Sequence, residues 1–152
     1  MKRAELLASG AGGALLLALG GCAPAGKPNV MLTAIARVML NGALPDDGEA
    51  LDAAVRGTLT AIAGLPPAVQ GEIHQLFGLL EFPLSRRLLA RVGPWDRASD
   101  GEIAAFLENW RGSNTALFRS GYAALHQLIM AGWYGNGASW ARIGYPGPPR
   151  IV

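Results

Sequence analysis

Thiols, histidines and charges are all scarce in this sequence of 152 residues. Cys22 is the only cysteine, and the two histidines are His74 and His126. A single thiol excludes an intramolecular disulfide, and neither histidine has a cysteine or a pair of acids at the spacing of metal ligands. Charged residues make up 16% of the chain, its net charge is +2, and no lysine follows Lys27. Because no basic stripe could follow a phosphate backbone, the sequence excludes nucleic-acid binding.

Motifs of the common catalytic sites are also absent from the sequence. No serine stands in a nucleophile elbow, and no C-x-x-C-H haem attachment exists. The stretch GNGASW has two glycines at dinucleotide spacing, but it lacks the third glycine and a preceding strand. Asp46 and Asp47 are explained more simply as acids at the start of a helix than as a metal pair. We therefore expect a chain that is not an enzyme and holds no cofactor or metal of its own.

The first 21 residues have the composition of an export signal. Lys2 and Arg3 are followed by an apolar run from Leu6 to Gly21 that contains several glycines. This run is shorter and richer in glycine than a transmembrane helix of about 20 apolar residues. The sequence therefore predicts three parts: an export signal over 1–21, a helical bundle over 22–132, and a C-terminal docking tail over 133–152.

Two features of the predicted signal bear on the route of export. The sequence LGGC at Cys22 resembles the lipobox of bacterial lipoproteins, in which the thiol accepts a diacylglycerol; cleavage after APA at Ala25 is the alternative. Lys2-Arg3 resembles the arginine pair of a Tat (twin-arginine) leader, although Glu5 stands where an apolar residue is usual. We expect a periplasmic protein exported by Tat or Sec, with a membrane anchor if Cys22 is lipidated.

Apolar residues recur at helical spacing through the middle of the chain. Spacings of three and four predict helices within 29–40, 45–67, 68–82, 84–93, 99–111 and 115–134, and no stretch alternates with the period of a strand. The sequence therefore predicts an all-α bundle of about six helices with an irregular C-terminal tail. The expected core-facing residues are Val30, Ile35, Val38, Met39, Leu51, Val55, Leu59, Ile62, Val69, Ile73, Leu76, Phe77, Leu80, Ile103, Phe106, Leu107, Trp110, Leu117, Gly121, Leu125, Leu128 and Ile129.

Local signals place several of the helix ends. Pro66-Pro67 stops one helix and can open the next, because proline is tolerated in a first turn. Ser99 and Glu102 have the spacing of a capping box. Gly93-Pro94 is expected to close the helix within 84–93, and Ser113 or Asn114 is expected to cap the last one.

The last 20 residues, 133–152, contain four aromatic residues, four glycines, three prolines, two arginines and no acid. A disordered tail would be polar and poor in aromatics, so this segment is expected to lie against a surface. Trp133 and Trp140 could close the bundle's own core, whereas the end of the tail is expected to dock onto another subunit. The expected partner-binding residues are Trp133, Tyr134, Trp140, Ile143, Tyr145, Pro146, Pro148 and Pro149.

The last third of the chain resembles the small subunits of bacterial FAD-dependent dehydrogenases of the glucose-methanol-choline type, as in gluconate 2-dehydrogenase subunit 3. The matching features are Trp110 and Ser113, the helix with Tyr122 and Leu125, the Trp133-Tyr134 pair, Trp140, and IGYPGPP from Ile143 to Pro149.

This resemblance implies a non-catalytic subunit that binds, stabilises and helps to export a large catalytic subunit acting on sugars or other alcohols. The FAD would belong to that partner, and electrons would continue to a cytochrome c subunit or to quinone. The sequence leaves two alternatives open. One is a free-standing periplasmic helical lipoprotein that binds a small apolar ligand or an envelope component, and the other is a small enzyme that uses His74 or His126.

Overall fold

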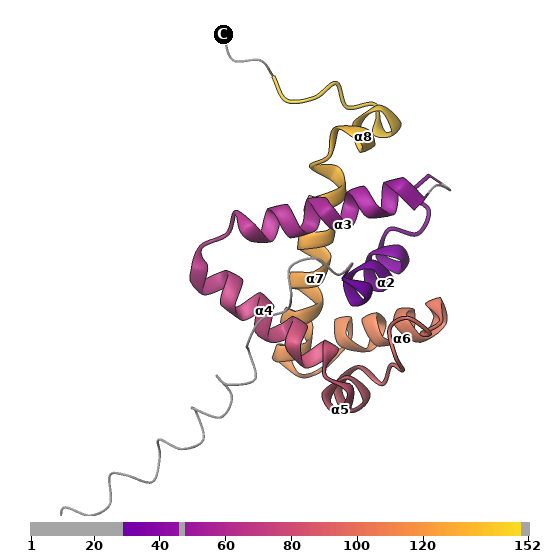
Figure 1. The fold of residues 1–152 in the computed structure, drawn as a ribbon, viewed down its shortest axis with the longest axis vertical. Helices are drawn as coiled ribbons and strands as arrows, with labels where there is room; N and C mark the ends of the chain where they lie inside the picture. The colour runs from indigo at the N-terminus through magenta and orange to yellow at the C-terminus, as the bar shows by residue number, and fades with distance from the viewer. Residues whose placement is uncertain (1–28, 46–47, 150–152) are drawn as a thin grey trace, which may run out of the picture.

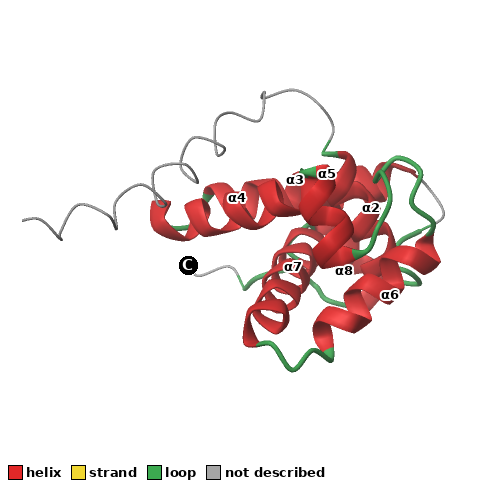
Figure 2. Ribbon diagram, turned by 90° about the horizontal axis from the view of Figure 1, so that it is seen from below, coloured by secondary structure: helices red, strands yellow, loops and turns green. Residues whose placement is uncertain are grey.

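The computed structural model describes residues 29–45 and 48–149. Over these ranges the secondary structure consists of helices joined by turns and loops, without a strand (Figures 1 and 2). The predicted all-α bundle is confirmed, with seven α-helices in these ranges against the expected six or so. Two of the seven are single turns. The helices are α2 (Val30–Met39), α3 (Gly48–Ala63), α4 (Pro67–Glu81), α5 (Pro83–Ser85), α6 (Asp100–Arg111), α7 (Ala116–Tyr134) and α8 (Gly137–Trp140), with a π-helical turn, η1 (Arg86–Ala90), and a 3₁₀ turn, η2 (Ala141–Ile143).

The long helix α7 organises the bundle. It crosses α3 at close range, with α4 on one side of it and α2 and α6 on the other (Figures 1 and 2). Glycines make the crossing possible, because a Cβ on Gly57 would overlap the carbonyl group of Gly132. A Cβ on Gly132 would overlap Thr58 and lie 2.8 Å from the carbonyl oxygen of Ala54. The backbones of α3 and α7 are therefore in contact at these two glycines, where neither helix has a side chain.

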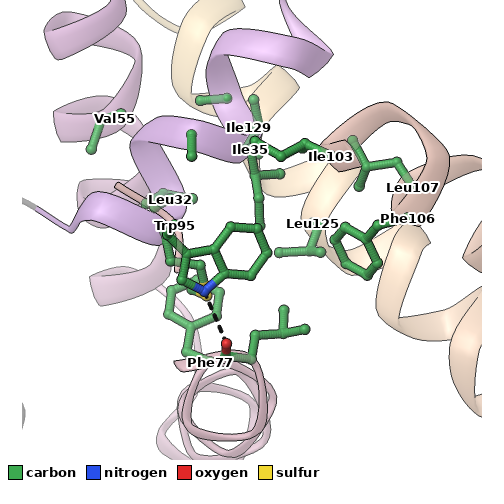
Figure 3. Packing of buried hydrophobic residues seen from close by; sticks show 14 of the residues in the cluster. Leu32, Ile35, Val55, Phe77, Trp95, Ile103, Phe106, Leu107, Leu125 and Ile129 are labelled. Atoms are coloured by element: carbon green, nitrogen blue, oxygen red, sulfur yellow. Dashed lines mark hydrogen bonds between the residues drawn. The ribbon is translucent and has the colours of Figure 1, made fainter. Parts of the chain in front are cut away.

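The core lies between α2, α3, α4, α6 and α7, and Figure 3 shows how its side chains meet. Two tryptophans join the core to the ends of neighbouring elements: Trp95 Nε1 donates to the carbonyl oxygen of Leu80 at 2.9 Å, and Trp110 Nε1 to that of Leu89 at 3.0 Å. Phe106 packs edge-on against both rings, with centroid distances of 6.1 Å and 4.8 Å. Each indole therefore fills apolar space while its N–H is satisfied.

Several helix ends lie where the local signals predict them. Ser99 and Glu102 form the complete capping box, with the Ser99 hydroxyl accepting from the backbone N–H of Glu102 at 3.2 Å and the Glu102 carboxylate accepting from that of Ser99 at 2.9 Å. The Pro66-Pro67 pair separates α3 from α4, with Pro67 in the first turn. These helix ends are determined by contacts between residues a few positions apart, so a sequence pattern can predict them.

Two other predicted helix ends are wrong: the C-terminal end of the helix within 84–93 and the N-terminal cap of α7. The segment after Pro83 becomes a short α-turn and the π-turn η1, which ends at Arg91 with φ of 57°, before Gly93-Pro94. The left-handed turn at Arg91 lets the next residue, Val92, enter the core. Thr115, rather than Ser113 or Asn114, precedes the first residue of α7, and the Ser113 hydroxyl accepts from the backbone N–H of Thr115 instead.

Some residues on the expected core faces are exposed. Val30, Leu59, Val69 and Leu117 keep 46%, 42%, 38% and 72% of their accessible surface. Helical spacing identifies an apolar face, but it does not say whether a neighbouring helix covers the whole of that face. Val69 and Leu117 share one such uncovered region, which forms the first part of the candidate site.

Candidate interaction surface

A groove of about 560 Å³ separates α4 from α7. Buried side chains of Ile73 and Trp110, together with Gly121, form its floor, and the exposed Val69 and Leu117 stand on its rim. Its other lining residues are Ala61, Leu65, Glu72, Leu76, Leu79, Leu89, Phe118, Ser120, Ala124, Gln127, Leu128 and Ala131. We call this feature the α4–α7 groove.

The floor of the α4–α7 groove is held in place by the indole of Trp110. Its ring stacks on Phe118 with a centroid distance of 5.2 Å and an interplanar angle of 22°. A Cβ on Gly121 would lie 2.6 Å from Trp110 Cζ3, so the indole rests directly on the backbone of α7. With the Nε1–Leu89 hydrogen bond, these contacts fix the orientation of the indole and satisfy its one polar group.

Charge is nearly absent from the α4–α7 groove. Glu72 is the one charged residue in its lining, which otherwise carries only the polar side chains of Ser120 and Gln127. His74 and His126 are both exposed and do not line it, and His126 stacks on Tyr122 at 5.8 Å. Over the residues that the structure describes, no three His, Cys, Asp or Glu side chains gather as they would around a metal ion. The groove therefore suits apolar surface rather than a charged substrate.

The second part of the candidate site is the C-terminal tail, which leaves the bundle at the end of α7 (Figure 1). The helix extends through Tyr134, so the Trp133-Tyr134 pair ends a helix rather than opening the tail. Trp133 is 2% exposed and belongs to the core cluster, so it cannot contact a partner in this conformation. The expectation that Trp133 closes the bundle's own core agrees with this position.

The tail is folded around Trp140 rather than around the bundle. Trp140 Nε1 donates to the carbonyl oxygen of Tyr134 at 2.9 Å, and the ring of Tyr145 meets the indole edge-on at 5.5 Å. The backbone N–H of Tyr145 donates to the Trp140 carbonyl at 2.9 Å. Gly147, at φ of 100°, lies so close that a Cβ there would be 3.1 Å from Trp140 Cζ3. We call Trp140, Tyr145 and Gly147 with the residues between them the tail hook.

The remaining expected partner-binding residues are solvent-exposed in or beside the tail hook. Ile143 and Tyr145 keep 56% and 44% of their accessible surface, Tyr134 is exposed, and Trp140 is half-buried by the hook itself. Pro146, Pro148 and Pro149 are exposed as well. Cys22 and the predicted export signal lie outside the described residues.

The α4–α7 groove and the tail hook are both attached to the C-terminal part of α7: Ala131 lines the groove, and the carbonyl oxygen of Tyr134 accepts from Trp140 of the hook. Tyr134 follows Ala131 by three residues, a spacing that places both on the same face of a helix. The sequence pattern did not reveal the groove, because its walls come from helices distant in the chain. The signal that could have found it is the excess of apolar positions on the predicted helices within 68–82 and 115–134.

The buried face of η1 holds one further unusual residue. Arg86 is buried, and it is the one charged side chain in that class within ranges 29–45 and 48–149. Its Nε has no hydrogen-bond partner. It does not line the α4–α7 groove, and no ligand chemistry follows from it alone.

No helix in the described part of the chain is both long enough and apolar enough to span a bilayer. Searches against protein-family models, curated proteins and solved structures found no match. Function is therefore inferred from the two surfaces and from the sequence.

Proposed function

We propose that this chain is a non-catalytic small subunit that binds, stabilises and helps to export a large FAD-dependent dehydrogenase acting on sugars or other alcohols. The observation that carries the proposal is the tail hook, which is ordered around Trp140 while Ile143 and Tyr145 face solvent. Tyrosine and tryptophan are enriched among the residues that contribute most of the binding energy at protein interfaces.

The adjoining α4–α7 groove supports the same proposal. An uncovered apolar groove between two helices is a common receptor for the apolar face of a partner helix. The groove reaches Ala131 and the tail hook is hydrogen-bonded to Tyr134 three residues later, so one partner could cover both. The proposed class of partner rests on the resemblance of residues 110–149 to dehydrogenase small subunits. FAD would be held by that partner, with a cytochrome c subunit or quinone as the next electron carrier.

The proposed function is tested by purifying the tagged chain from its native host and reading flavin absorbance and the mass of any co-purifying protein. We expect a yellow complex with a much larger subunit. Deleting the tail from Gly144 onward, or replacing Ile143 and Tyr145 together by alanine, should abolish its recovery. Leu84→Ala is the matched control, since Leu84 is exposed and apolar but lies in α5, outside both surfaces. A colourless, monomeric and folded protein would refute the proposal.

Export and anchoring are separate parts of the proposal. If the leader uses Tat, replacing Lys2-Arg3 by Lys-Lys should leave the protein in the cytoplasm, whereas unchanged export would indicate Sec. If Cys22 is lipidated, labelled palmitate should enter the wild-type protein and not Cys22→Ser. No incorporation into the wild type, beside a labelled lipoprotein control, would remove the membrane tether.

A second candidate function is binding of a small apolar ligand by a free-standing periplasmic lipoprotein. The volume of the α4–α7 groove favours it, because small-molecule sites measure roughly 300–1,000 Å³. Ala124 lines the groove and is half-buried, so Ala124→Phe should fill it. Solvent extraction of the purified protein should then yield a bound apolar compound from the wild type and none from this variant.

A further inference from the structure

The α4–α7 groove is an apolar surface without a covering element among residues 29–45 and 48–149. The chain itself contains a segment of matching chemistry in residues 6–21, which carry six leucines, no charge and otherwise only alanine, glycine and one serine. We propose that residues 6–21 of the same chain occupy the α4–α7 groove and act as an intramolecular cover of this surface.

Length supports this occupant. Sixteen residues would extend about 24 Å as a helix, at 1.5 Å per residue. The groove follows α4 from Val69 to Leu79 and α7 from Leu117 to Ala131, which correspond to about 15 Å and 21 Å of helix at the same rise. A segment of this size therefore matches the groove from end to end. The small residues among the leucines allow a close approach to the floor, where Gly121 lacks a side chain.

The connection to the bundle also permits this placement. Residues 22–28 join the segment to Asn29 at the start of α2, and seven extended residues reach about 25 Å. This tether is therefore longer than either wall of the groove.

Charge then sets the direction of the segment. With residue 21 at the Leu79 end, residues 6–21 run parallel to α4, and their first residues lie at the Val69 end. Glu72, the one charged residue of the groove lining, lies at that end, and Lys2 and Arg3 precede the apolar segment. Opposite charges therefore meet in this direction and in no other.

The cover would keep two apolar surfaces out of water in the precursor. It would also hold the export signal against the folded bundle. Under the proposed function, a partner that binds the same groove would displace residues 6–21. The export signal would then be accessible to the export machinery in assembled complexes before it is accessible in the free chain. This last step depends on the proposed function, whereas occupancy of the groove by residues 6–21 does not.

Disulfide formation in the full chain tests the cover without any partner. In a Cys22→Ser background, Leu15→Cys is combined with Ser120→Cys, at the groove, or with Ala104→Cys, an exposed residue of α6 outside it. Both pairs share the same tether, so a docked segment should raise the rate of intramolecular oxidation roughly tenfold for the groove pair. Equal rates would overturn the proposal. A disulfide between two chains, seen as a dimer, would assign the groove to a second copy instead.

A charge reversal provides the second measurement. Glu72→Lys should slow oxidation of the groove pair several-fold, because it places a cation beside Lys2 and Arg3. Glu81→Lys is the matched control, since Glu81 is exposed on the same helix but outside the groove, and it should leave the rate unchanged. Equal slowing by both variants would refute the assigned direction. Circular dichroism of each variant verifies that the bundle is intact.

Discussion

Gly132→Ala should destabilise the protein, whereas Gly78→Ala should stabilise it. Both glycines lie inside α-helices, and each substitution adds a single methyl group. At Gly132 the added Cβ would overlap Thr58 and lie 2.8 Å from the carbonyl oxygen of Ala54, where α7 crosses α3. At Gly78 no atom lies within 4 Å of the added Cβ. The two variants therefore separate the effect of packing from that of helix propensity.

The expected magnitudes follow from these surroundings. Alanine is favoured over glycine in a helix by about 1 kcal/mol, and this gain applies at both positions. Overpacking a filled site costs about 1–3 kcal/mol. Gly132→Ala belongs at the upper end, because the contacts are made largely by backbone atoms that cannot rotate away. We expect a net loss of about 2 kcal/mol at Gly132 and a gain of about 1 kcal/mol at Gly78.

Thermal unfolding followed by circular dichroism measures both effects in one experiment. For a domain of this size, 1 kcal/mol shifts Tm by roughly 4 °C, so we expect a fall of about 8 °C and a rise of about 4 °C. A Gly132→Ala protein as stable as Gly78→Ala would mean that the helices do not meet at Gly132. The described crossing of α3 and α7 would then be wrong.

Other predictions concern the capping box and the tryptophans. Ser99→Ala should cost about 1 kcal/mol of unfolding free energy in urea, because it removes the helix cap. The pKa of Glu102 is held below its ordinary value of 4.5, chiefly by the hydrogen bond from the backbone N–H of Ser99 and then by the Ser99 hydroxyl. The stabilisation that comes from ionised Glu102 is therefore present above about pH 4.5 and is lost as the pH falls through the lowered pKa. Ser99→Ala should therefore reduce the loss of unfolding free energy that occurs as the pH falls through this range. Trp95→Phe should cost about 2 kcal/mol, since it leaves the carbonyl of Leu80 without its partner; an unchanged urea midpoint would contradict that hydrogen bond. Trp133→Ala should cost about 3–5 kcal/mol because the ring is fully buried, and a loss under 1 kcal/mol would place it at the surface instead.

Sequence predicted those parts of the fold that depend on neighbours in the chain. The Ser99–Glu102 capping box and the break at Pro66-Pro67 are confirmed because each is decided within one helical turn. The turn at Arg91 was missed, because a left-handed residue that is not glycine carries no local signal. Its conformation depends on burying Val92 in a core assembled from distant helices.

The candidate site could be predicted only in part, for a related reason. The composition of the tail predicts that it docks onto a surface. The exposure of Ile143 and Tyr145 agrees with this docking role, which stays a prediction. Trp133 has the same composition signal, but the end of α7 carries it into the core. Likewise, periodicity assigned Leu117 to the core, although it stands on the rim of the α4–α7 groove. Which apolar residues are covered is decided by the distance between helices, and a single sequence does not encode that distance in any local pattern.

The tail hook has a consequence for the entropy of association. Fixing a residue's backbone costs about 1–2 kcal/mol, so a tail without internal contacts would lose several kcal/mol when a partner ordered it. The contacts of Trp140 with Tyr134, Tyr145 and Gly147 already order the tail in the free chain, so this entropy is lost during folding and not during binding. Since each 1.4 kcal/mol changes an affinity tenfold, Trp140→Ala should weaken association even if the indole never touches the partner. Preorganisation would then make a half-buried tryptophan as important to binding as the exposed residues that it holds in place.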